Sequence, residues 1–167
     1  MRIDYASHVI VGYVVQVEDL FRKLLRRRDG LTHEEDRFDP RTGKQAAPAT
    51  VVDVEAGWDV VVDGRAFEGP ESKAVSSLWG WRWEPDGELL DVLAARVGCS
   101  VTLLGRAHDE IVFVCFQPTG LRRRKDGSVP LDSIAKHRGE VKRIGRAAKE
   151  LRLRLGRPGV YAITEEA

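Results

Sequence analysis

The sequence predicts an α+β domain with a mainly antiparallel sheet, and three observations support this fold class. Short runs of β-branched and alternating apolar residues recur along the chain, which is typical of strands. Three segments, at about 17–28, 87–97 and 130–155, have the apolar spacing of helices. These helices lie between runs of strands, an order that favours antiparallel pairing. We therefore expect a single globular domain over residues 1–167, with three helices and about six to eight strands.

The N-terminal part of the chain predicts a strand, a helix and a long loop, in that order. Residues 8–16, HVIVGYVVQ, are almost all apolar, which indicates a strand buried on both faces. Residues 17–28 have apolar side chains four apart, acidic residues at the start and three arginines at the end, as suits a helix and its dipole. Residues 29–49 are polar and contain the turn signal DPRTG, so we expect a long polar loop there.

The middle of the chain predicts a hairpin and a strand rich in tryptophan. Residues 50–55 and 58–64 are expected to pair through the segment EAG, with a short edge piece after them. In SLWGWRWEP, residues 77–85, three tryptophans alternate and would share one strand face. That face is either core or an exposed platform. We expect burial of Trp79 and Trp81, whereas Trp83 is the one most expected to reach the surface.

A second helix and a second hairpin follow the tryptophans. Asp86 is a suitable N-terminal cap for the helix over 87–97, and Gly98 a suitable stop. The next two strands carry the only two cysteines, Cys99 and Cys115, which would face each other if the hairpin turned about residue 107. We expect both thiols to be reduced, buried and inert.

The C-terminal part is strongly basic. Residues 121–157 hold 13 Lys or Arg and 4 Asp or Glu, a balance of +9, whereas residues 1–120 hold 14 and 20, a balance of −6. A basic loop at 118–129 precedes the predicted helix 130–155, and residues 159–163, GVYAI, predict a last strand. The helix has an apolar stripe for docking on the core, which also includes His137, and its remaining face is cationic. We expect the binding surface to combine these cations with Trp83; its residues are Arg122, Arg123, Arg124, Lys125, Arg138, Lys142, Arg146, Lys149 and Trp83.

Sites for chemistry are poorly supported by the sequence. No phosphate-binding glycine loop, nucleophile elbow or zinc spacing is present, so neither catalytic residues nor a cofactor are predicted. His33 lies among acidic residues in THEED, where a divalent metal could bind, although a solvated acidic loop is the simpler explanation. The carboxylates near the central hairpin, such as Asp59 and Asp63, are interpreted as the polar face of a half-exposed sheet.

These patterns favour a non-enzymatic interaction or regulatory protein. It would bind an acidic macromolecule, either a nucleic-acid backbone or an acidic protein, through the basic C-terminal helix. One alternative is an immunity- or antitoxin-like inhibitor that uses the acidic segment 31–39 and an exposed tryptophan. The other is a small metal-dependent enzyme built on the His33 loop. With no signal-peptide layout and no apolar run of the roughly 20 residues that a membrane span needs, we expect a cytoplasmic protein with no membrane partner.

Overall fold

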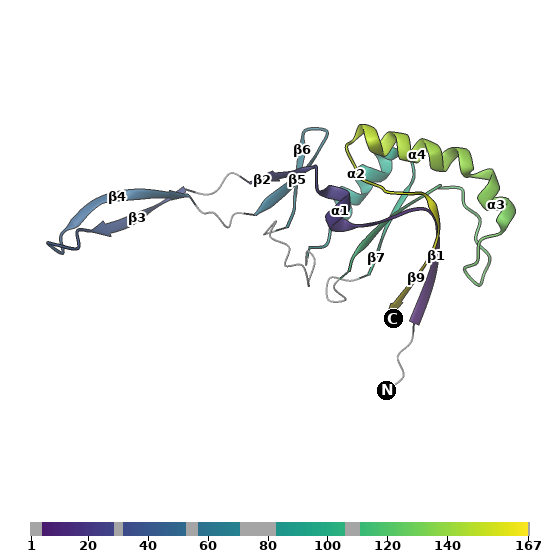
Figure 1. Cartoon of the computed structure of the whole chain (residues 1–167), viewed down its shortest axis with the longest axis horizontal. Helices are drawn as coiled ribbons and strands as arrows, with labels where there is room; N and C mark the ends of the chain where they lie inside the picture. The colour runs from purple at the N-terminus through teal and green to yellow at the C-terminus, as the bar shows by residue number, and fades with distance from the viewer. Residues whose placement is uncertain (1–4, 29–31, 53–56, 71–82, 106–110, 167) are drawn as a thin grey trace.

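A computed structural model describes residues 5–28, 32–52, 57–70, 83–105 and 111–166 (Figure 1). The fold class is α+β, as predicted, and every strand pairing among these residues is antiparallel. The strands nevertheless form three sheets instead of one, and the described residues hold four helices instead of three. The elements are β1 (Tyr5–Gln16), α1 (Val17–Phe21), β2 (Leu25–Arg27), β3 (Thr32–Phe38), β4 (Gln45–Val52), β5 (Trp58–Val62), β6 (Arg65–Glu68), α2 (Gly87–Val97), β7 (Ser100–Leu104), β8 (Phe113–Gln117), α3 (Leu131–Lys136), α4 (Arg138–Glu150) and β9 (Gly159–Glu166).

The main sheet has the strand order β7-β8-β1-β9. β1 is an interior strand, since its first part pairs with β9 and its second part with β8. This position explains its apolar sequence and confirms the predicted buried strand at 8–16. The packed core joins β1 and β8 to α1, α2 and α4, with Phe21, Leu89, Phe116 and Ile144 fully buried.

Helix α2 confirms the prediction for 87–97. The Asp86 side chain accepts a 2.8 Å hydrogen bond from the backbone N–H of Leu89, and Gly98 ends the helix in the left-handed conformation at φ 70°. Arg143 of α4 then donates to the carbonyls of Val97 and Gly98, at 3.1 and 2.7 Å. The C-terminal carbonyls of α2 are therefore paired with a cation that also complements the helix dipole.

The predicted helix over 17–28 is wrong beyond its first turn. α1 ends at Phe21, and Leu25–Arg27 form β2, which pairs with Val60, Asp59 and Trp58 of β5. Leu24 and Leu25 are buried in this arrangement, as they would have been on a helix. The apolar spacing therefore identified the buried residues, but a partner strand more than 30 residues away decided the backbone conformation.

The predicted hairpin between residues 50–55 and 58–64 is also wrong for the part of the chain that the structure describes. β5 pairs with β2 and β6, and β6 is the expected edge piece. β4 pairs with β3, so residues 29–49, where the sequence favours a loop, include β3 and the first part of β4, joined by a short turn. This β3–β4 hairpin, hereafter the arm, projects away from the other sheets (Figure 1).

The predicted C-terminal helix 130–155 is divided and shorter. α3 and α4 meet at His137, and α4 ends at Glu150 because Arg152 adopts a left-handed φ of 62°. Leu153 and Leu155 are buried in the extended segment that follows. The predicted apolar stripe is confirmed at Ile144 and Ala148, and the last strand is present as β9.

The two cysteines are free and buried, as predicted, but they are not opposite each other. β7 and β8 pair in a different register from the predicted one, with Thr102 facing Cys115. Burial raises the pKa of Cys99 from 9.0 to about 11 and that of Cys115 to about 12, so both thiols are protonated at neutral pH.

Candidate functional site

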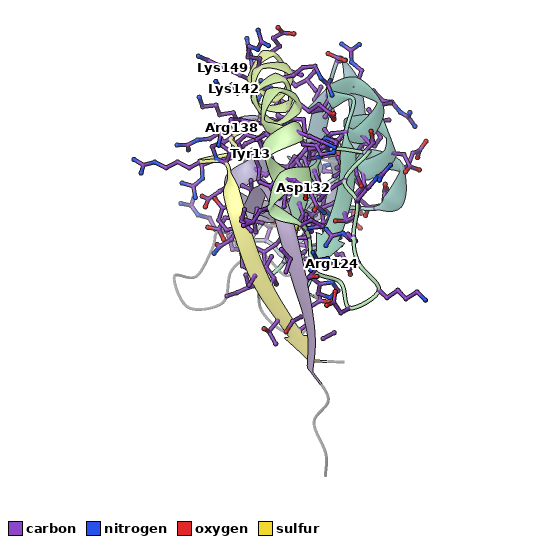
Figure 2. The ribbon with its side chains drawn as sticks, turned by 90° about the vertical axis from the view of Figure 1, so that its right-hand side faces the viewer. Tyr13, Arg124, Asp132, Arg138, Lys142 and Lys149 are labelled. Carbon is purple, nitrogen blue, oxygen red and sulfur yellow. The ribbon has the colours of Figure 1, made fainter. Side chains whose placement is uncertain are left out.

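The predicted binding residues of the C-terminal helix lie together on one side of α4. They follow one another at spacings of four, four and three residues and define the α4 face: Arg138, Lys142, Arg146 and Lys149. Figure 2 shows Arg138, Lys142 and Lys149 along the same side of the helix. All four side chains are exposed and form no ion pair or hydrogen bond with any residue that the structure describes. At about 1.5 Å per residue, the row is about 16 Å long.

A groove of about 700 Å³ runs beside this face. Lys142, Arg146 and Lys149 line one part of it, and apolar or small residues line the rest: Tyr13, Gly145, Leu153, Leu155 and Gly156. The groove therefore combines three cations with an apolar floor. An anion that docks there would meet positive charge already held on a helix packed against the core.

Tyr13 fixes the spacing between β1 and α4 at this groove. Its ring is 5% exposed, and its hydroxyl donates a 3.2 Å hydrogen bond to the carbonyl of Val141. The hydroxyl passes directly over Gly145, where a Cβ would lie far inside van der Waals distance. Burial, and secondly the nearby Tyr161, raise the pKa of Tyr13, so the hydroxyl stays a neutral donor at neutral pH.

The basic loop does not extend the α4 face, in contrast to the predicted continuous surface. Arg122 and Arg124 line a different pocket, of about 440 Å³, which shares no residue with the α4 groove. Figure 2 shows Arg124 beyond the end of the helices that is distant from Lys149. Lys125, also in the loop, is exposed and lines neither pocket.

Arg123 forms hydrogen bonds to the main sheet that its sequence context does not predict. Its guanidinium donates to the carbonyl of Val9 at 2.6 Å and to Oε1 of Gln117 at 2.7 Å. Gln117 is buried and also accepts from the backbone N–H of Val11 at 3.3 Å. Arg123 therefore ties the basic loop to the main sheet, while its neighbours Arg122 and Arg124 keep their side chains free of such bonds within the described residues.

Trp83 packs on the core instead of standing beside the cations. Its half-buried ring meets Phe21 edge-on, with ring centroids 5.6 Å apart and an interplanar angle of 67°. It lines neither of the two basic pockets. The prediction for Trp79 and Trp81 concerns residues outside those that the structure describes.

The carboxylates of the central strands are engaged in ion pairs. Asp59 accepts from Arg28 at 3.1 Å, and Asp63 pairs with Arg96. His33 lies on β3 opposite Val51, but its side chain is outside the described part of the structure. Among the described side chains, no group of three His, Cys, Asp or Glu residues is placed to hold a metal ion.

Comparison with known proteins gives no relative. No family model, curated protein or solved structure matches the chain. Over the residues that the structure describes, none of the helices combines the length and apolarity that a membrane crossing requires. The interpretation of this protein therefore depends on its own geometry.

Proposed function

We propose that this protein binds nucleic acid through the α4 face, chiefly by contacts with the phosphate backbone. The observation that supports this is the row of four exposed cations along one helix, none of which is bonded to a carboxylate of the described residues. Residues 138–157 hold eight Lys or Arg and two Glu, a balance of +6. Such a row attracts a chain of phosphates, and binding releases the counterions that surround the nucleic acid.

The composition of the face favours nucleic acid over an acidic protein. Two of its four cations are lysines, and lysine is depleted at protein–protein interfaces, whereas aromatic anchors are enriched there. The α4 face carries no exposed aromatic or large aliphatic side chain. A phosphate backbone needs no such anchor, because charge and hydrogen-bond donors position it.

Fluorescence anisotropy with labelled single-stranded and duplex oligonucleotides tests this function. We expect binding that weakens steeply between about 50 and 200 mM salt, with a slope of about −3 in a plot of log K against log salt concentration. The double variant K142E/K149E should lose most of the affinity. The matched control is Lys44→Glu combined with Lys125→Glu, which changes the net charge equally but leaves the α4 face intact.

The proposal is wrong if neither oligonucleotide binds at the lower salt concentration, or if the control variant loses as much affinity as K142E/K149E. The second outcome would show that only the net charge matters. Replacing Trp83 should have no direct effect on binding, since its ring packs against Phe21.

The arm favours a second candidate function, an inhibitor that acts by protein contacts. Residues 34–38 lie on β3, and all five are exposed, including Phe38 at 63%. An exposed aromatic residue on a projecting ribbon suits a hydrophobic pocket in a partner protein. In that case a stoichiometric complex with one host protein should be lost on Phe38→Ser and retained in K142E/K149E. The reverse pattern would exclude this function.

A further inference from the structure

The pocket at the basic loop, hereafter the loop pocket, is lined by residues from two elements, whereas the α4 face lies on a single helix. It lies between the loop at 118–129 and α3 and has a volume of about 440 Å³. Its polar lining comes from both elements and consists of Arg122, Arg124, Asp132, Ser133, Lys136 and His137. Figure 2 shows Arg124 and Asp132 near the end of the helices that is distant from Lys149. Cations from two separate elements therefore line one partly open pocket.

The charge of the loop pocket is positive. Arg122, Arg124 and Lys136 oppose the single carboxylate Asp132 in the lining. Beyond the lining, Asp126 in the loop has a lowered pKa, first because Ser128 donates hydrogen bonds to it and also because Arg124 is near. None of the three cations forms a side-chain ion pair or hydrogen bond with a described residue.

His137 is a further polar group of the pocket, and the fold holds it in place. The side chain of His137 is only 14% exposed, and its Nδ1 lies 2.9 Å from Oε1 of Glu140. Because a carboxylate only accepts, Nδ1 donates, and Nε2 has no partner among the described residues. Gly120 lies beside this ring, since a Cβ at position 120 would be in van der Waals contact with Cε1 at 3.4 Å.

Ser133 provides an observation that is independent of the charge of the pocket. It is 7% exposed, one of two buried polar residues in the described core, and it lines the pocket. Its hydroxyl forms no hydrogen bond with any residue that the structure describes. Buried hydroxyls normally have partners, so a hydroxyl with no partner among the described residues, at the edge of a cationic pocket, is available to hydrogen-bond a bound molecule.

We propose that the loop pocket binds a terminal phosphate group, that is, a phosphate monoester on a small molecule or at the end of a chain. Such a group carries close to two negative charges and three acceptor oxygens, which match cations that converge from several directions. A phosphodiester within a strand needs a surface that is open at both ends, as the α4 face is. The volume lies in the range of small-molecule sites, so the pocket has room for more than the phosphate itself.

Isothermal titration calorimetry with defined probes tests this site. The probes are inorganic phosphate, glucose 6-phosphate and, as a negative control, glucose. A pair of oligonucleotides with a 5′-phosphate or a 5′-hydroxyl completes the set. We expect both phosphate compounds to bind and glucose not to bind. Tighter binding of glucose 6-phosphate than of phosphate would identify a small phosphorylated molecule as the ligand, and a preference for the 5′-phosphorylated oligonucleotide would identify a strand end.

Two variants locate the binding. Lys136→Gln should weaken phosphate binding by about tenfold or more, because it removes a charged donor. Ser133→Ala should also weaken it, while leaving the melting temperature of the free protein unchanged or higher, since the hydroxyl has no partner to lose among the described residues. Lys142→Gln, on the α4 face, is the matched control and should bind phosphate like the unmodified protein.

The inference is wrong if neither phosphate compound binds up to about 10 mM. It is equally wrong if Lys142→Gln weakens phosphate binding as much as Lys136→Gln does. These outcomes are separate from the failure of the proposed function, which is measured with the 5′-hydroxyl oligonucleotide and the α4-face variants.

Discussion

The hydroxyl of Tyr13 occupies the space above Gly145 in which any other residue would place its Cβ. A Cβ at position 145 would fall well inside 3.0 Å of Tyr13 Oη and lie 3.2 Å from Cζ. Glycine inside a helix costs about 1 kcal/mol relative to alanine. Here the glycine has a structural reason. Because it has no Cβ, the buried tyrosine can reach the carbonyl of Val141 and set the depth of the α4 groove.

Gly145→Ala should therefore destabilise the protein, by about 1–2 kcal/mol, even though it improves helix propensity. Gly139 is the matched control, because it lies in the same helix with no atom within 4 Å of its Cβ position. Gly139→Ala should stabilise by about 0.5–1 kcal/mol. Urea unfolding measures both free energies.

A double-mutant cycle assigns the effect to the tyrosine. In a Tyr13→Phe background, Gly145→Ala should cost less than in the unmodified protein, because the oxygen that it meets is gone. Equal costs in both backgrounds would contradict the proposed steric relationship.

The second prediction concerns the two thiols. Because burial raises the pKa of Cys99 to about 11 and of Cys115 to about 12, roughly one Cys99 in a thousand is a thiolate at pH 8, and fewer Cys115. Both should react with Ellman's reagent only as fast as the protein opens, and both should react at once in urea. Rapid modification of either thiol in the native protein would contradict their buried positions.

The same shifts give stability a defined pH dependence. The unfolded thiols ionise near 9.0, below the folded values, so the folded state binds more protons between these pKa values. The contribution of the thiols to the free energy of unfolding is present below pH 9.0 and is lost as the pH rises toward about 11 and 12. Replacing both cysteines with alanine should make the stability curve flatter in this range.

Local signals in the sequence predicted the parts of the fold that depend on neighbours along the chain. Asp86 and Gly98 lie directly at the ends of α2, where side-chain and backbone geometry suffice to cap a helix. Residues 25–27 could not be assigned in this way, because their partner is β5. The arm was missed because its strands lack the usual signals: β3, THEEDRF, is polar, and β4, QAAPATVV, contains a proline and shows no alternation of apolar and polar residues.

The candidate site shows the same limit. The sequence located the cations but could not show which of them are structural and which line a pocket, because this difference depends on contacts between residues that are distant in the chain. Arg123 reaches Val9, 114 residues away, whereas Arg122 and Arg124 line the loop pocket. Ser133 carried no signal at all, since a serine in a helix becomes informative only when its burial and lack of a described partner are known.

The third prediction is that the arm can be removed without unfolding the rest of the protein. The side chains described in 34–51 are exposed or half-buried, and none belongs to either hydrophobic core cluster. Replacing residues 32–52 with a short glycine-serine turn should leave the melting temperature within a few degrees. Differential scanning calorimetry measures this, and a large drop would show that the arm supports the core.

The last prediction separates a structural arginine from its neighbours. Arg123→Met should lower the free energy of unfolding by about 1–2 kcal/mol, because Gln117, which is buried, loses a charged donor at 2.7 Å and the Val9 carbonyl loses one at 2.6 Å. Arg124→Met is the control in the same exposed loop and should change stability by no more than about 0.5 kcal/mol.

Arg123→Lys should recover only part of the loss, since one ammonium group cannot span both acceptors as the planar guanidinium does. The loop would then hold the pocket residues Arg122 and Arg124 less firmly, so Arg123→Met should also weaken phosphate binding at the loop pocket. Oligonucleotide binding on the α4 face should be unchanged. Equal stability of the Arg123→Met and Arg124→Met variants in urea would show that the bonds to Val9 and Gln117 do not hold the loop on the sheet.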